Sequence, residues 1–81
     1  MDITVYCKNN CAQCSATKRA LDRKGIEYKT INIEDAGNEH YRDALLAEGF
    51  MQMPVVKINN ADDTANEQSW SGYRPDLIKS L

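Results

Sequence analysis

Residues 6–18 read Y-C-K-N-N-C-A-Q-C-S-A-T-K, and Cys11 and Cys14 stand in them as a C-x-x-C pair. The residues just before, 2–6, alternate polar and apolar side chains, which predicts a half-buried strand. The residues that follow, 12–24, contain no glycine or proline and are rich in strong helix formers, which predicts a helix. The cysteine pair is therefore expected where a strand gives way to a helix.

The rest of the chain continues this alternation. The pattern predicts a strand at 27–33, a helix at 38–48, a strand at 53–58 opened by Pro54, and a helix at 75–81. Residues 59–69 are polar and predict a long loop with at most a weak strand at its end. A strand–helix–strand start requires a crossover, so the first two strands should be parallel.

Helix ends and the buried face of the first helix are also predicted. Gly25 and Gly49 should end the first two helices, with Ile26 folding back as the apolar residue of a glycine-terminated cap. Ala16, Ala20 and Leu21 are expected on the buried face of the first helix.

Composition narrows the class of protein. The 81 residues suffice for one α/β domain, 1–81, with a small core. The net charge of −2 gives no reason to expect nucleic-acid binding. No stretch is long and apolar enough to cross a membrane, and no secretory signal is visible at the start. We therefore expect a cytoplasmic monomer, and in the cytoplasm structural disulfides are rare.

The position of the cysteine pair indicates redox chemistry. A thiol at a helix N-terminus faces unpaired N–H groups, so the pKa of Cys11 should fall below the free value of about 8.5. Lys8 and Lys18 can add positive potential. Cys14 lies one turn deeper on the same face, so a shielded thiol can resolve the mixed disulfide that an exposed thiolate forms.

Two other uses of the cysteines remain open on the residues alone. Cys7, Cys11, Cys14 and His40 make a zinc or copper site if the second helix brings His40 to the loop. Alternatively the pair is a structural staple in a non-catalytic scaffold. Cys7 is expected as a small, half-buried residue at the end of the first strand, and a regulatory Cys7–Cys11 disulfide is a further hypothesis.

The chain as a whole resembles the glutaredoxin-like NrdH-redoxins of the thioredoxin superfamily. The resemblance rests on C-x-Q-C at 11–14, A-T-K at 16–18, E-G-F-x-x-x-P-V-V at 48–56 and, most specifically, S-W-S-G-Y-R-P-D at 69–76. It implies a thioredoxin-like fold with a central mixed sheet of about four strands flanked by three helices. It also implies a cis peptide before Pro54, which would face the cysteine pair.

The resemblance further implies a function. Such proteins carry electrons to the large subunit of a class Ib ribonucleotide reductase. They are re-reduced by thioredoxin reductase, whose flavin takes electrons from NADPH, and they bind no cofactor of their own. Ala12 and Gln13 replace the Pro-Tyr that glutaredoxins usually carry between the cysteines, so glutathione should bind poorly. A glutathione-dependent glutaredoxin is the nearest alternative.

The residues expected to act fall into two groups. Cys11 is the predicted nucleophile and Cys14 the resolving cysteine. A partner-docking surface is expected from Lys8, Gln13, Met53, Pro54, Trp70, Ser71, Gly72, Tyr73 and Arg74. The structural alternative is that Trp70 and Tyr73 complete the core and that Arg74 braces the last helix or pairs with Asp76.

Overall fold

The computed structural model describes residues 2–59 and 68–81. The elements run β1 (Asp2–Cys7), α1 (Ala12–Arg23), β2 (Lys29–Asn32), α2 (Glu39–Ala47), β3 (Val55–Asn59), β4 (Gln68–Ser71) and α3 (Pro75–Lys79). This order confirms the predicted alternation, and the boundaries differ from the predicted ones by at most two residues.

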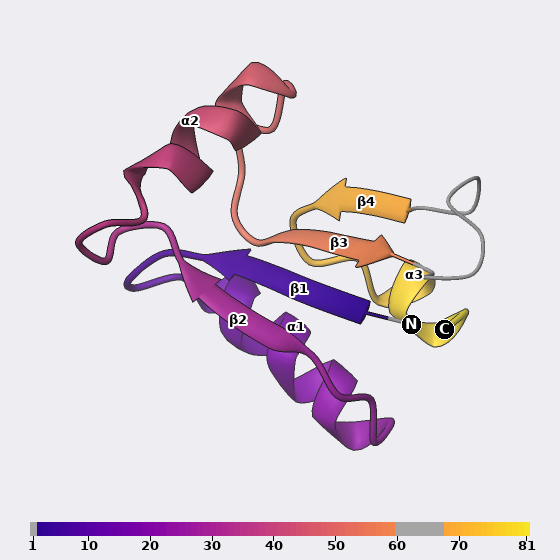
Figure 1. Cartoon of the computed structure of the whole chain (residues 1–81). Helices are drawn as coiled ribbons and strands as arrows, with labels where there is room; N and C mark the ends of the chain where they lie inside the picture. Colours follow the sequence, from indigo (N-terminus) through magenta and orange to yellow (C-terminus); the bar gives the residue numbers. More distant parts are fainter. Residues whose placement is uncertain (1, 60–67) are drawn as a thin grey trace.

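The four strands form one mixed sheet in the order β2-β1-β3-β4 (Figure 1). β1 is parallel to β2, as the crossover rule predicts, and antiparallel to β3, which in turn is antiparallel to β4. Val5 lies at the middle of the sheet, opposite Thr30 on one side and Val56 on the other. The expected mixed sheet of about four strands with three helices is therefore confirmed.

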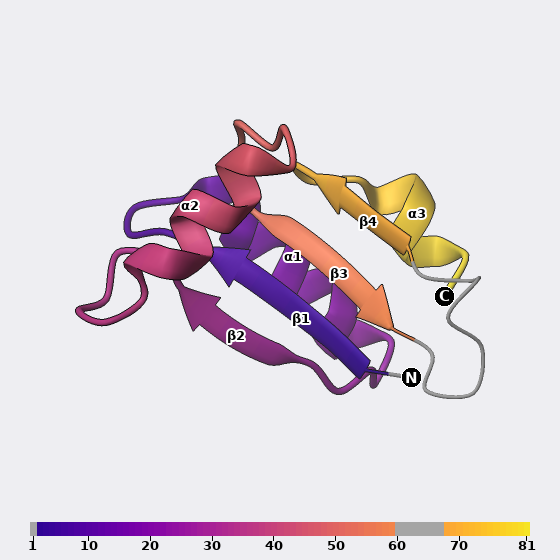
Figure 2. The same cartoon turned by 45° about the horizontal axis from the view of Figure 1, so that its top comes forward.

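Helices cover the two faces of the sheet unequally. α1 and α3 lie on one face, and α2 crosses the other face near the C-terminal end of β1 (Figure 2). The larger core cluster lies under α1 and α3 and contains Ile3, Val5, Leu21, Val56, Ile58, Trp70 and Ile78. The smaller cluster lies under α2 and contains Ile33, Leu45 and Val55. The alternation of side chains along β1 and β3 sorts them between the two clusters.

α1 and α2 end in the same way. Gly25 N–H donates to Asp22 O and Ile26 N–H to Leu21 O, which satisfies carbonyls that the helix end leaves unpaired. Gly49 N–H and Phe50 N–H repeat this pattern on Leu46 O and Leu45 O. Ile26 and Phe50 pack against the larger and the smaller core cluster respectively, so each cap also closes an apolar contact.

Two sequence-based expectations are wrong in part. Asn59, expected in a loop over 59–69, belongs to β3 instead. The weak strand expected at the end of that stretch is confirmed by β4, which takes in Gln68 and Ser69, and residues 60–67 lie outside the described residues. Backbone pairing with the neighbouring strand, rather than apolar content, holds these polar residues in the sheet. The buried face expected for α1 is confirmed at Leu21, and Ala20 packs against the larger core cluster, but the other fully buried positions differ.

The buried face of α1 carries Cys14, Thr17 and Leu21, whereas Ala16 and Ala20 are only half-buried. The three buried residues form one row along the helix, and this row faces the sheet. Cys14 is therefore buried because of its position on the sheet-facing side of α1, not because its side chain is apolar.

Candidate redox site at the start of helix α1

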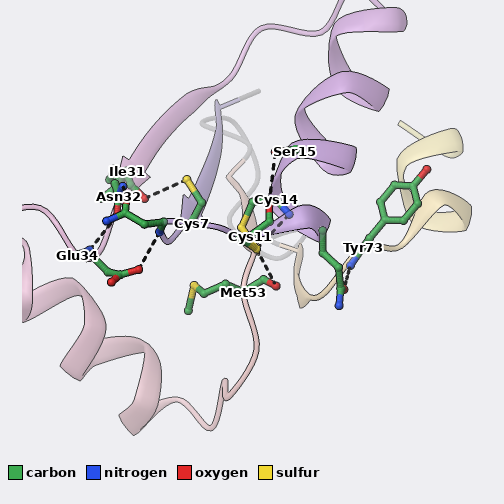
Figure 3. The surroundings of a disulfide bond; sticks show 11 residues. Cys7, Cys11, Cys14, Ser15, Ile31, Asn32, Glu34, Met53 and Tyr73 are labelled. Carbon is green, nitrogen blue, oxygen red and sulfur yellow. Dashed lines mark hydrogen bonds between the residues drawn. A yellow bond between two sulfur atoms is a disulfide. The ribbon is translucent and has the colours of Figure 1, made fainter.

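The cysteine pair closes the N-terminus of α1. Cys11 is the N-cap residue and has an extended backbone, and Cys14 lies in the first turn of the helix. The two form a disulfide with their Cα atoms 5.2 Å apart (Figure 3). The junction predicted from sequence is therefore where the pair lies, between β1 and α1.

The two sulfurs have different surroundings. Cys14 is 2% exposed, whereas Cys11 is half-buried. The backbone N–H of Cys14 donates to Cys11 Sγ at 3.2 Å, as an N-cap acceptor receives a donor of the first turn. In the reduced protein this N–H and the positive end of the helix favour a Cys11 thiolate. Cys11 Sγ also lies 3.6 Å from Met53 O. In the reduced protein this carbonyl can accept a hydrogen bond from the Cys11 thiol, which favours the protonated thiol over the thiolate.

The loop before Cys11 is braced by the last residue of β2 and by a residue that follows this strand. Glu34 Oε1 accepts a hydrogen bond from Asn9 N–H at 2.7 Å, and Asn32 Nδ2 donates to Asn9 Oδ1 at 2.8 Å. Asn10 takes a positive φ of 57°, which asparagine tolerates better than most residues. Sequence reasoning missed Asn32 and Glu34, because only the parallel pairing of β1 with β2 brings them to this loop.

The residue before the proline that precedes β3 lies against the disulfide, since Met53 O is 3.6 Å from Cys11 Sγ. The Met53–Pro54 peptide is cis, as the sequence predicts. Pro54 is buried, and its carbonyl accepts a hydrogen bond from Gly72 N–H at 2.8 Å. This bond ties the segment that follows β4 to the proline turn beside Cys11.

Gln13 makes a second tie to the same segment. Its Oε1 accepts a hydrogen bond from Tyr73 N–H at 2.9 Å across 60 positions of sequence. Gly72 has a φ of +80°, and a Cβ there would lie 3.2 Å from Gln13 Oε1 and 3.3 Å from Gln52 Oε1. Gln13 therefore holds the backbone at 72–73 and leaves no room for a side chain at position 72.

A shallow groove of about 320 Å³ runs beside the disulfide. Its lining comprises Lys8, Asn10, Cys11, Ala12, Gln13, Met51, Gln52 and Met53. Met51 is 88% exposed, and an exposed flexible thioether suits a surface that contacts other chains. Met51 and Gln52 were not expected in the site, although their place directly before Met53 and Pro54 is a signal that could have indicated them.

The remaining predicted residues divide between the core and the surface. Trp70 is 6% exposed and packs in the larger core cluster, so its side chain completes the core and is not part of the surface. Ser71 is half-buried and Tyr73 is 39% exposed. Arg74 binds Asp76 through two hydrogen bonds of 3.2 and 3.0 Å. These bonds from the guanidinium hold the pKa of Asp76 below its ordinary value.

The residues of the alternative metal site are not gathered. Among residues 2–59 and 68–81, no cluster of three histidine, cysteine or acidic side chains has a spacing suited to a metal ion. Cys7 is free and buried, and its sulfur points to Ile31 O at 3.7 Å, away from the disulfide (Figure 3). The ring of His40 lies against Tyr41, with 4.0 Å between centroids.

The fold and the site together define a redox protein of the thioredoxin superfamily, with a disulfide at a helix N-terminus beside a cis-proline. Residues 3–61 match the family model described as Glutaredoxin. The chain belongs to the glutaredoxin family and, within it, to the glutaredoxin-like NrdH proteins.

Relatives and solved structures agree with this assignment. The glutaredoxin-like protein NrdH of Salmonella typhimurium is 45% identical, with 100% of this chain and 89% of the relative covered. The Lactococcus lactis subsp. cremoris protein of the same name is 32% identical, with 98% and 97% covered.

A solved structure of the Escherichia coli glutaredoxin-like protein NrdH-redoxin, described for its thioredoxin-like activity profile, is 43% identical. It matches with a TM-score of 0.83 and coverage of 100% of this chain and 95% of that one. An Archaeoglobus fulgidus glutaredoxin, 23% identical with a TM-score of 0.71 over 99% of this chain and 84% of that one, shares the fold. The described part of the chain holds no helix with the length and apolarity that a bilayer crossing demands.

Proposed function

We propose that this redox protein is a dithiol carrier in which Cys11 is the nucleophile and Cys14 the resolving cysteine. One observation carries the proposal: the two form a disulfide in which Cys11 is half-exposed at a helix N-terminus and Cys14 is buried. A partner disulfide can therefore reach one sulfur and not the other.

The reaction balances over two exchanges. The Cys11 thiolate attacks one sulfur of a partner disulfide, which forms a mixed disulfide and releases the other partner sulfur as a thiolate. Cys14, deprotonated, then attacks Cys11 Sγ, which forms the Cys11–Cys14 bond and releases the second partner sulfur. Two electrons pass to the partner, whose two thiolates take up protons from solvent.

The partners belong to the proposal as well. The electrons go to the mobile C-terminal tail of a ribonucleotide reductase large subunit, and thioredoxin reductase returns them from NADPH through its flavin. Kinship with the NrdH proteins and the S-W-S-G-Y-R-P-D motif support this route. The cytoplasm is its compartment, because a dithiol carrier of this kind works in a reducing environment.

The docking surface is proposed around the groove beside the disulfide. Lys8, Gln13 and Met53 line it, and Tyr73 stands on the far side of Gln13. Pro54 and Gly72 are joined through their backbone, half-buried Ser71 precedes Gly72, and Arg74 is held by Asp76; we include all four in the proposed surface. Residues 72–73 are tied to Pro54 and Gln13, and Ala12 and Gln13 replace the Pro-Tyr of ordinary glutaredoxins; both features support a reductant other than glutathione.

The test is a coupled assay of NADPH oxidation with a disulfide substrate. Thioredoxin reductase is supplied in one arm, and glutathione with glutathione reductase in the other. We expect turnover in the first arm and little in the second. Cys11→Ser should abolish turnover, Cys14→Ser should trap a mixed disulfide visible by mass spectrometry, and Cys7→Ser should behave as the unaltered protein.

Each contrary result has a definite meaning. Turnover only with glutathione would make this chain a glutathione-dependent glutaredoxin. Turnover that survives Cys11→Ser would remove Cys11 from the reaction. Inactivity in both arms, together with a tightly bound equivalent of zinc or copper, would make the cysteines metal ligands.

A further inference from the structure

A buried hydroxyl lies on α1 three residues after Cys14 and has no role in the exchange described above. Thr17 is 0% exposed, and its Oγ1 has no hydrogen-bond partner among the residues that the structure describes. A threonine inside a helix commonly satisfies its hydroxyl on the carbonyl three or four positions earlier. Thr17 does not do so, although it carries a polar group fully removed from solvent.

The place of Thr17 on α1 relates this hydroxyl to Cys14. Residues three positions apart lie on the same face of a helix as neighbours. Cys14, Thr17 and Leu21 are the buried residues of α1. Thr17 is thus the polar member of the row that begins with the resolving cysteine, and Cys14 itself is only 2% exposed.

The hydrogen-bonding needs of Cys14 change with oxidation state. In the disulfide, its sulfur is bonded to Cys11 and carries no proton. Reduction adds two electrons to the S–S bond and, with protons from solvent, gives Cys14 a thiol in a place that water does not reach. A hydroxyl can accept from that thiol, and it can donate to the thiolate that forms when the thiol loses its proton.

We propose that the Thr17 hydroxyl is the hydrogen-bond partner of the Cys14 sulfur in the reduced protein, and that it positions this sulfur for the resolving step. The inference rests on the proposed roles of Cys11 and Cys14. The hydroxyl is unpaired in the disulfide form and paired in the dithiol form. It therefore stabilises the dithiol form selectively and raises the reduction potential of the pair.

Thr17→Val is the direct test, since valine keeps the branched shape and removes the hydroxyl. The ratio of disulfide to dithiol is measured at equilibrium in a dithiothreitol redox buffer, without any partner protein. We expect the variant to favour the disulfide five- to tenfold more than the unaltered protein. At about 29.6 mV per tenfold, this is a potential roughly 20 to 30 mV more negative.

Companion variants separate this role from a purely structural one. Thr17→Ser keeps a hydroxyl and should stay near the unaltered potential, whereas Thr17→Ala should shift in the same direction as Thr17→Val even if its fold is weakened. Thr4→Val makes the same chemical change on β1 and should leave the potential unchanged. Urea unfolding of both forms should show that Thr17→Val stabilises the disulfide form relative to the dithiol form.

An unchanged reduction potential in the Thr17 variants would overturn the proposal. Equal potentials for Thr17→Val, Thr17→Ala and the unaltered protein, with equal changes in stability of both oxidation states, would reduce Thr17 to a packing residue. Because the equilibrium needs no partner, it also separates the two proposals. A shifted potential combined with no turnover in the NADPH assay would defeat the proposed function and leave the Thr17–Cys14 interaction standing.

Discussion

Gly72 shows how a single position can be constrained from two directions. Its φ of +80° is a left-handed conformation that costs other residues about 1–2 kcal/mol. Its neighbours add a second constraint, since Gln13 Oε1 and Gln52 Oε1 stand 3.2 and 3.3 Å from where a Cβ would lie. The glycine of the S-W-S-G-Y-R-P-D motif is thus required both by the backbone turn and by the amide that reaches over from α1.

Gly72→Ala should therefore cost more than the same change at Gly37, where φ is +89° and a Cβ would meet nothing within 4 Å. We expect Gly37→Ala to lower the free energy of unfolding by about 1–2 kcal/mol through backbone strain. Gly72→Ala should lose roughly 1 kcal/mol more, because Gln13 must release Tyr73 N–H. Urea unfolding gives the energies, and hydrogen exchange of the Tyr73 amide reports the bond. Equal losses with an unchanged Tyr73 amide would contradict the second constraint.

Helices α1 and α3 are joined at their C-terminal ends by one lysine. Lys24 follows the last residue of α1, and its ammonium donates to Ile78 O, Lys79 O and Leu81 O at 3.1, 2.8 and 3.0 Å. A cation at this place satisfies carbonyls that the end of α3 leaves unpaired and complements the negative end of its dipole. The short helix α3 therefore depends on a residue 54 positions earlier for its termination.

Lys24→Gln should loosen α3 and lower the free energy of unfolding by about 1 kcal/mol, because an exposed cluster of charge-assisted bonds is partly replaced by water. Amide hydrogen exchange should quicken in α3 and stay unchanged in β1. Lys29→Gln, at an exposed lysine on the edge strand β2, is the matched control and should change neither quantity. Protection of α3 that survives Lys24→Gln would show that the core contact of Ile78 suffices to hold the helix.

The whole molecule holds its sheet between two apolar clusters, and neither depends on the disulfide for its members. Neither core cluster contains Cys11 or Cys14, and each is closed by side chains from the sheet and from the helices on its face. The disulfide lies where β1 leads into α1, with Cys14 buried and Cys11 half-buried (Figure 3). A bond in this place can open and close while both clusters stay intact.

Reduction should therefore leave the chain folded. Far- and near-ultraviolet circular dichroism should be retained, and the free energy of unfolding should change by no more than about 2 kcal/mol, since the closed loop is short. Urea unfolding with and without reductant measures the change, with Cys11→Ser/Cys14→Ser as the permanently open control. Loss of tertiary signal on reduction would instead make the pair a structural staple.

Features set by neighbouring residues were predicted from the sequence better than features set by contacts between residues far apart in the chain. The glycine-ended helices at Gly25 and Gly49 and the parallel start of the sheet were predicted from the residues, because local conformation or one handedness rule sets each. The cis bond before Pro54 was predicted from the resemblance to the NrdH-redoxins. Asn59 was wrongly placed in the loop over 59–69, and the strand at the end of that stretch was expected only as a weak one, because strand pairing and not composition holds these residues in the sheet. Trp70 could not be assigned between core and surface, since a large aromatic side chain suits both.

By itself the sequence determined the C-x-x-C pair at a strand-to-helix junction, the order of elements and the kinship with redox proteins. All three follow from neighbouring residues and from short motifs. Only the tertiary structure decided the surroundings of the pair: Met53 O lies against Cys11, Gln13 accepts from Tyr73 N–H, and Thr17 is buried on the same helix as Cys14. The first two join residues 42 and 60 positions apart. The third depends on which row of α1 meets the sheet, and packing alone sets that orientation.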